Sequence, residues 1–205
     1  LLQLSRILLG FRSPSSTFRF NLYVLSACFE EVAVNSDLNQ PITGREVQIE
    51  GVKAIMSKTD LQGRITHASR SLLEISGYSL DELIGQDHNI LRHPDMPRAI
   101  YYLMWQTIQR GEEFYGMTVN RAKNGDHYWV FTRVAPIERE GQVVGYSSVR
   151  FVPPRDVIKG YESLYREMRE AEKAHGKEDE EQCLKGVAVL NEFLAKQGAK
   201  NLTEY

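Results

Sequence analysis

The sequence predicts an α+β domain in which a five-stranded antiparallel sheet carries short helices on one face, with further helices after it. Apolar residues have a helical spacing over 97–110 and change to a period of two from Phe114. Tight-turn sequences separate the strand-like segments at 59–65, 124–125 and 139–142. Strands on both sides of a group of helices, joined by short turns, are typical of the α+β class.

A β-hairpin is expected first. The segment Thr59-Asp-Leu-Gln-Gly-Arg-Ile65 places Asp and Gly at the corner of a tight turn. This turn joins the apolar stretch 54–56 to the strand-like segment 65–68. Because the turn is short, the two strands must run antiparallel.

Three helices are expected next, over residues 69–76, 80–84 and 97–110, and a glycine follows each of them. Ser79 and Glu82 have the spacing of a capping box, which satisfies backbone N–H groups at the start of the second helix. The third helix has apolar residues at a spacing of four, at Ile100, Met104 and Ile108. This spacing predicts one apolar face directed at the sheet.

Three more strands are expected, over 114–120, 128–137 and 143–152. Asn124-Gly125 is the strongest short hairpin signal, and the turn 139–142 reverses the chain again. The second of these strands is rich in aromatic and β-branched residues, which favour sheets. Pro153-Pro154 ends the sheet, because proline cannot donate to a ladder of backbone hydrogen bonds.

The run His88-Asn-Ile-Leu-Arg-His-Pro-Asp-Met-Pro97 carries the most polar chemistry of the chain. Its prolines forbid one continuous helix, because each lacks an N–H and restricts the residue before it. The run should therefore form a bent connector that aims Arg92 and His93 at an anion or a planar polar ligand. A charged surface turn beside a helix N-terminus is the alternative interpretation.

These motifs, in this order, resemble a PAS domain of the bacterial aerotaxis-receptor type, a sensory module that holds FAD and reports redox state. The resemblance covers residues 39–154. It is carried by the following segments: Thr59-Asp-Leu-Gln-Gly-Arg-Ile65, Gly77-Tyr-Ser-Leu-Asp-Glu-Leu-Ile-Gly85, the run His88 to Pro97, Met104-Trp105, Asn120-Arg121 and Lys123-Asn-Gly-Asp-His-Tyr-Trp-Val130.

The resemblance implies an FAD site formed by Arg92, His93, Asp95, Trp105 and Asn120. At two further site positions the chain departs from the family. Ser69 stands where asparagine is common, and Phe114 stands where tryptophan is common. Serine still forms hydrogen bonds and phenylalanine still stacks, so both residues are kept in the expected site.

The chemistry of a flavin gives a separate reason for a similar set of residues. Its ring needs an apolar, aromatic slot with polar groups at the pyrimidine edge, and its diphosphate needs cationic or N–H donors. Candidates for the slot are Trp105, Phe114, Tyr101 and Met117, and candidates for the donors are Asn120, Arg92 and His93. Ordinary core packing is the alternative for Trp105, and exposure to water is the alternative for Asn120.

Two other states of the pocket stay open at this point. His93 can ligate a haem iron, as histidine does in some oxygen-sensing PAS domains. The pocket can also be without a cofactor, in a module that serves only for interaction or dimerisation. Cys28 and Cys183 lie outside the expected sheet, so a light-driven flavin–cysteinyl adduct is not expected. Redox sensing is the expected flavin mechanism.

Composition excludes several classes of function. With 205 residues, 42% hydrophobic residues and a net charge of −2, the chain can bury one core and has no bias toward nucleic acid. No apolar run approaches the roughly 20 residues that span a bilayer. Two cysteines without CxxC spacing fit a reducing cytoplasm. No GxSxG, HExxH or Walker A motif is present, so neither an enzyme nor a metal site is expected.

Three regions are expected along the chain: an N-terminal segment over residues 1–33, the sensory domain 34–154 and a helical extension 155–205. The N-terminal segment has no acidic residue before Glu30 and resembles a targeting peptide in composition, and it can also be non-native or disordered. The extension carries two apolar stripes: Val157, Tyr161, Leu164, Tyr165 and Met168, then Leu184, Val187, Leu190 and Leu194. They either pack on this domain or form a dimer or partner interface.

The resemblance also implies a partner. In receptors, the PAS domain precedes a membrane anchor and a methyl-accepting chemotaxis signalling region. In a two-protein arrangement, a lone PAS protein in the cytoplasm pairs with a separate receptor. The chain looks more like the second case, although a truncated receptor would look the same up to Tyr205. A change at the flavin is expected to pass through the sheet to the C-terminal helices.

Overall fold

The computed structural model describes residues 41–49, 51–52 and 54–199. The expected N-terminal segment, which includes Cys28, lies outside the described residues. No helix within the described ranges is both long enough and apolar enough to cross a bilayer.

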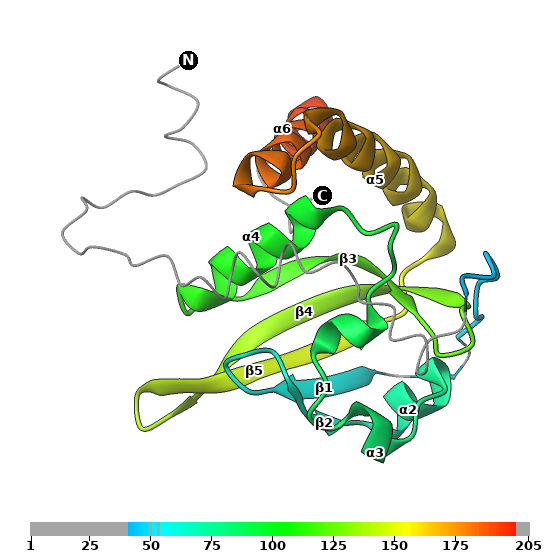
Figure 1. Cartoon of the computed structure of the whole chain (residues 1–205), viewed down its shortest axis with the longest axis vertical. Helices are drawn as coiled ribbons and strands as arrows, with labels where there is room; N and C mark the ends of the chain where they lie inside the picture. Colours follow the sequence, from blue (N-terminus) through cyan, green and yellow to red (C-terminus); the bar gives the residue numbers. More distant parts are fainter. Residues whose placement is uncertain (1–40, 50, 53, 200–205) are drawn as a thin grey trace.

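A five-stranded antiparallel sheet forms the centre of the fold, in the order β2-β1-β5-β4-β3 (Figure 1). Its strands are β1 Ile55–Thr59, β2 Ile65–Ala68, β3 Phe114–Arg121, β4 His127–Arg139 and β5 Gln142–Phe151. Hairpins join β1 to β2, β3 to β4 and β4 to β5, and β1 also pairs with β5, which brings the first and last strands together at the centre. The expected α+β fold with five antiparallel strands is confirmed.

Four short helical segments connect β2 to β3: α2 Arg70–Ser76, α3 Leu80–Leu83, the 3₁₀ helix η2 His88–Leu91 and α4 Arg98–Gln109. The expected capping box is present at the start of α3. The Ser79 side chain accepts a hydrogen bond from the Glu82 backbone N–H, and the Glu82 side chain accepts one from the Ser79 backbone N–H. Ser69 caps α2, since its hydroxyl accepts from the Leu72 backbone N–H at 3.3 Å. The prolines break the chain into η2 and α4, as the bent connector required.

The period of two in the strands divides the sheet into two faces with different chemistry. Thr118, Thr132 and Ser148 are buried on the inner face, which α4 and η2 cover. Met117 and Trp129 alternate with these residues and are buried in the apolar cluster that includes Tyr161 and Tyr165. The inner face therefore has a polar surface at the middle of the sheet, where an ordinary core would be apolar.

The C-terminal extension forms two antiparallel helices, α5 Arg155–His175 and α6 Glu180–Gln197, which pack against each other. α6 also packs on α4, and Figure 1 shows the pair next to α4 and the β3 side of the sheet. Both helices bury their apolar stripes on this domain, so the first of the two alternatives for the stripes is the observed one.

Two positions of the expected stripes are wrong by one residue. Val157 is 38% exposed and Ile158 is buried in its place, while Leu184 is 47% exposed and Cys183 is buried. Val157 and Ile158 lie four and three residues before Tyr161, so a helix that advances by about 100° per residue lets either of them extend the stripe. Both hydrophobic residues were compatible with the spacing, and packing against the sheet selects one of them.

Backbone groups at both outer strands have partners outside the sheet. On β3, the Met117 carbonyl accepts from the Tyr165 hydroxyl at 2.5 Å, and the Val119 N–H donates to the Met96 sulfur at 3.2 Å. On β2, the Ile65 N–H donates to the Gln86 carbonyl at 2.8 Å, and the Ile65 carbonyl accepts from the Gly85 N–H at 2.8 Å.

Candidate ligand-binding site

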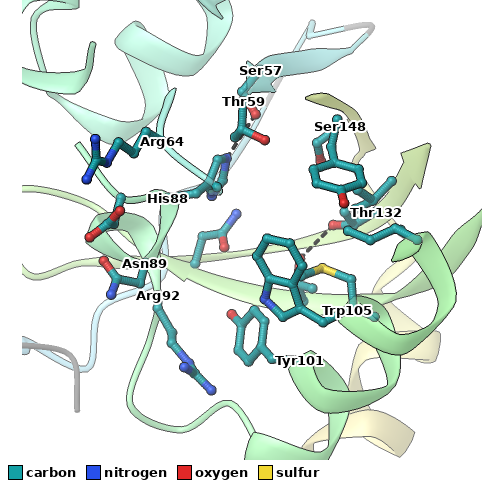
Figure 2. Close-up of a pocket in the computed structure, with 18 of the residues that line it drawn as sticks. Ser57, Thr59, Arg64, His88, Asn89, Arg92, Tyr101, Trp105, Thr132 and Ser148 are labelled. Atoms are coloured by element: carbon teal, nitrogen blue, oxygen red, sulfur yellow. Dashed lines mark hydrogen bonds between the residues drawn. The ribbon is translucent and has the colours of Figure 1, made fainter. Parts of the chain in front are cut away.

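A cavity of about 160 Å³ lies between the inner face of the sheet and the helical segments that cover it. Figure 2 shows Tyr101 and Trp105 of α4 and His88 of η2 around the same space as Thr132 and Ser148 of the sheet. Side chains from five parts of the fold meet here: the β1–β2 hairpin, η2, α4, the β3–β4 pair and β5.

The floor of the cavity is polar and its hydrogen bonds are incomplete. The hydroxyls of Thr118 and Thr132 lie 2.7 Å apart. The Asn120 Nδ2 and the Ser148 Oγ are buried and have no hydrogen-bond partner among the described residues. Because buried polar atoms nearly always have partners, a floor of this kind suits a ligand that carries both donors and acceptors.

A buried three-residue network lies at one side of this floor. Arg150 donates to the Ser57 hydroxyl at 3.1 Å and to the His88 Nε2 at 2.8 Å, and these two acceptors are 2.9 Å apart. Burial, together with the charge of Arg150, lowers the pKa of His88 to about 3. His88 is therefore neutral near pH 7, and its Nε2 must be the unprotonated nitrogen because a guanidinium can only donate.

Aromatic side chains form the wall opposite this floor. Trp105 meets Tyr146 edge to face, with ring centroids 5.6 Å apart. Gly63, in the β1–β2 turn, has φ +84° and would place a Cβ 3.2 Å from the Trp105 ring, so only glycine lets the turn approach this closely. The guanidinium carbon of Arg92 lies 3.9 Å from the Tyr101 ring centroid, in a cation–π contact. The wall thus combines flat apolar surface with a positive charge.

The structure brings three of the expected site residues together at the cavity: Arg92, Trp105 and Asn120. Tyr101 of the expected aromatic slot also lines it. The backbones of Arg92 and Asn120 form an antiparallel bridge, which ties the end of η2 to β3. Trp105 is only partly buried, so it contributes to the cavity wall as well as to core packing.

His93 and Asp95 follow Arg92 in sequence but do not line the cavity. The His93 ring is buried near His127, with centroids 5.5 Å apart, and its Nδ1 accepts from the Asp95 backbone N–H at 3.1 Å. Burial lowers the pKa of His93 to about 4, with Asp95 acting in the opposite direction. The exposed Asp95 carboxylate pairs with Arg169 of α5 at 3.4 Å. In this structure the two residues hold the connector to its surroundings.

Ser69, Phe114 and Met117 also lie away from the cavity lining. The Ser69 hydroxyl caps α2 and accepts from the Met56 backbone N–H at 3.0 Å. Phe114 is buried in the main apolar cluster, and Met117 lies on the opposite face of the sheet from Thr118. That His93, Asp95, Ser69 and Phe114 contact a cofactor stays a prediction.

Sequence reasoning missed the network of Arg150, His88 and Ser57, as well as Ser148. A usable signal was present in β5, where Tyr146, Ser148 and Arg150 recur at a spacing of two. In a strand this spacing places all three on one face. A polar row on the inner face of a central strand indicates a ligand or a buried network.

Comparisons with known proteins agree with this arrangement. The family model of the PAS fold matches residues 65–150. The aerotaxis receptor of Escherichia coli (strain K12) is 40% identical over 158 residues, which are 76% of this chain and 29% of that protein. The nitrogen fixation regulatory protein of Klebsiella pneumoniae is 30% identical over 114 residues, 55% of this chain and 22% of that protein.

Among solved structures, the PAS domain of a protein from Colwellia psychrerythraea superposes with a TM-score of 0.43 at 25% identity, over 50% of this chain and 87% of that chain. This chain spans less than a third of the length of the two relatives above. The matched residues include β2 through most of β5, together with the helices that enclose the cavity. The chain therefore contains a PAS domain of the aerotaxis-receptor type.

Proposed function

We propose that this chain is a redox-sensing module that binds FAD in the cavity and transmits the redox state to a chemotaxis signalling partner. The observation that carries the proposal is the pairing of a polar floor with an aromatic wall. Asn120 Nδ2 and Ser148 Oγ lack partners in the described structure, and Tyr101 and Trp105 line the same space. A flat ring with donors and acceptors along one edge satisfies both surfaces.

The residues present fit a flavin in three respects. Asn120, Ser148 and the threonine pair would bind the polar edge of the ring, and Trp105 and Tyr101 would cover its apolar part. Arg92 and Arg64, which also line the cavity, would supply positive charge for the diphosphate. When bound, a flavin supplies reversible electron transfer, which a protein alone does not provide.

The geometry favours a flavin over a haem. A haem needs a histidine nitrogen directed at the iron. His93 does not line the cavity, and the Nε2 of His88, which does, already accepts from Arg150 and Ser57. The cysteine of α6, Cys183, is not among the lining residues either, which supports redox sensing over a cysteinyl adduct.

The helix α4 provides a route from the cavity to the C-terminal helices. It carries Tyr101 and Trp105 on the cavity side, and its first turn is bound by Glu172 of α5. A change in how the cavity residues hold their ligand would shift α4 and, through Glu172, the α5–α6 pair. Nearly complete switching of a two-state output takes roughly 5.5 kcal/mol of differential stabilisation, and a partial shift takes less.

The relatives suggest which process the module serves. The aerotaxis receptor of Escherichia coli covers the larger share of this chain at the higher identity. We therefore infer that the output partner is a methyl-accepting chemotaxis receptor region in the cytoplasm, on a separate protein or on a longer form of this chain. A homodimer that exposes α5 and α6 to this partner is compatible with the fold. We assign no catalytic activity.

The absorption spectrum of gently purified protein, before and after dithionite, tests the proposal. A flavin spectrum that bleaches on reduction, with FAD released on heating, is the expected result. A sharp Soret band would show that the bound cofactor is a haem and not a flavin. A colourless protein that fails to take up added FAD would leave the fold intact and refute the cofactor.

A further inference from the structure

Arg150 is a buried charge with unusual partners. Its side chain is on the central strand β5, and the residue is only 3% exposed. Other arginines in the described part of the chain form ion pairs: Arg133 with Glu113, Arg98 with Glu178 and Arg45 with Asp126. Within the same described ranges, no carboxylate lies within ion-pair distance of Arg150, and both of its hydrogen bonds go to neutral groups.

The groups around Arg150 do not neutralise it. Burial lowers the pKa of the guanidinium, but arginine stays protonated in proteins. Burial also raises the pKa of Tyr101 and raises that of Tyr128 to about 12, so both phenols are neutral. The pKa of His88 is about 3, so this ring neither adds nor removes charge near pH 7.

The cavity as a whole has an excess of positive charge. Its lining contains Arg64, Arg92 and Arg150, against one acidic residue, Asp87. Asp87 is exposed and forms no ion pair with Arg150. An unpaired buried charge is costly, and such charges are usually paired or bind a ligand of opposite sign. An anionic group inside the cavity would remove this cost.

The Arg150 guanidinium also has N–H donors that are available to a ligand. It has five N–H groups, of which the bonds to Ser57 and His88 use two. These two bonds hold the planar group at the cavity in one orientation. A preorganised donor of this kind costs little rearrangement when negative charge appears beside it.

We propose that Arg150, held by His88 and Ser57, is the anion-recognition residue of the cavity and binds the edge of a planar ligand ring that carries negative charge. This inference rests on the FAD function proposed above. In that case Arg150 faces the ring edge that gains negative charge on reduction, and it raises the midpoint potential of the bound cofactor. Neither the family motifs nor the expected site residues included Arg150.

Replacing Arg150 separates this role from a structural one. In Arg150→Met the Ser57 hydroxyl and the His88 Nε2 still bond to each other, so neither is left unsatisfied. The apo-protein should therefore unfold at an unchanged or higher denaturant midpoint. Arg150→Lys keeps the charge and should recover part of the ligand effect. Arg133→Met, which removes a paired arginine on the other face of the sheet, is the matched control.

The ligand readouts are the affinities for FAD and riboflavin and the midpoint potential of the bound flavin. Arg150→Met should weaken both ligands by the same factor, because riboflavin has the ring but no phosphate. It should weaken the reduced form at least about tenfold more than the oxidised form, which lowers the two-electron midpoint potential by about 30 mV. Arg133→Met should leave all three values unchanged.

Four results would overturn the inference. Loss of apo-protein stability in Arg150→Met with unchanged affinities and potential would make Arg150 a structural residue. Weaker binding of FAD but not of riboflavin would assign it to the diphosphate and refute the ring-edge role. If the unmodified chain takes up no flavin, the proposed function fails together with this inference. If the unmodified chain binds flavin and Arg150→Met has the same affinities and midpoint potential, the inference about Arg150 fails and the proposed function stands.

Discussion

The carboxylate of Glu172 accepts a hydrogen bond of 2.8 Å from the backbone N–H of Ala99, across 73 positions of sequence. Its second oxygen accepts from the Arg98 N–H at 3.0 Å. Pro97, at the N-cap of α4, has no side chain that can perform this function. A residue of α5 therefore caps the helix that lines the cavity, and its negative charge lies at the positive end of the α4 dipole.

Glu172→Gln should loosen the start of α4. Glutamine offers one acceptor oxygen where the carboxylate offers two, so one of the two backbone N–H groups is left without an acceptor. We expect a loss of about 1 kcal/mol in the free energy of unfolding, because an unsatisfied buried donor costs about 1–3 kcal/mol and the removed charge offsets part of it. Urea unfolding and amide exchange at Arg98 and Ala99 measure this. Glu170→Gln, an exposed change on α5, should alter neither.

Gly186→Ala should separate α6 from α4. A Cβ at this position would overlap the Glu172 Oε1 and lie 2.7 Å from the Ala99 Cβ. Overpacking of this kind costs about 1–3 kcal/mol, which outweighs the gain of about 1 kcal/mol in helix propensity. Chemical denaturation should show a net loss of stability, whereas the exposed change Glu192→Ala should show none. A stabilised Gly186→Ala protein would contradict the close packing of these helices.

Stability should fall as the pH drops below about 6.5. The pKa values of His88 and His93 in the folded chain are about 3 and about 4, and burial is the main cause of both. Between these values and the unfolded value near 6.5, the unfolded chain binds protons that the folded chain does not. Each histidine then removes about 1.4 kcal/mol of stability per pH unit, and above pH 6.5 this loss is absent.

Unfolding free energies measured from pH 7.5 to 5 test this dependence on pH. His88→Gln removes one titrating group and provides an amide oxygen that can accept from Arg150. It should therefore reduce the slope by about one proton. An equal slope for His88→Gln and the original chain would show that His88 is protonated in the fold.

The Thr118–Thr132 pair should behave non-additively. Each single change to valine leaves the other hydroxyl buried without its partner and should cost about 1 kcal/mol. The double change removes both hydroxyls with little change of shape, so it should recover most of that loss. A double-mutant cycle on the apo-protein gives the coupling energy directly. Additive costs would mean that the two hydroxyls do not depend on each other.

Asn120→Ala and Ser69→Ala should separate ligand binding from stability. Asn120 lines the cavity, so its loss should reduce flavin content with little change in unfolding. Ser69 caps α2, so its loss should cost about 1 kcal/mol of stability and leave flavin affinity intact. Flavin absorbance per protein and urea midpoints are the two measurements. The reverse pattern would place Ser69 in the binding site, as the family resemblance implies.

Much of the fold could be predicted because its signals are local. The capping box of Ser79 and Glu82 and the turn at Asn124-Gly125 depend only on residues a few positions apart, and both appear as expected. Short-range chemistry was enough for these two features. The family resemblance, and not a local signal, led to Arg92, Trp105 and Asn120, which share one cavity.

The remaining features depend on contacts that no short segment contains. Whether Val157 or Ile158 is buried depends on how α5 meets the sheet, since both fit the same helical spacing. Glu172 looked like one of many solvated carboxylates on a charged helix, and only the position of α4 makes it a cap. The spacing of two in β5 places Arg150 on the same face as Ser148, but only the assembled sheet shows that this face is the inward one.

The partners at the outer strands bear on how copies of this chain can meet. An open strand edge is a template on which another chain can add a strand, and this is a common route to aggregation and to swapped dimers. Here the Tyr165 hydroxyl and the Met96 sulfur occupy backbone groups of β3, and the loop at Gln86 occupies those of β2. Strand addition by another copy of the chain is therefore blocked at these backbone positions.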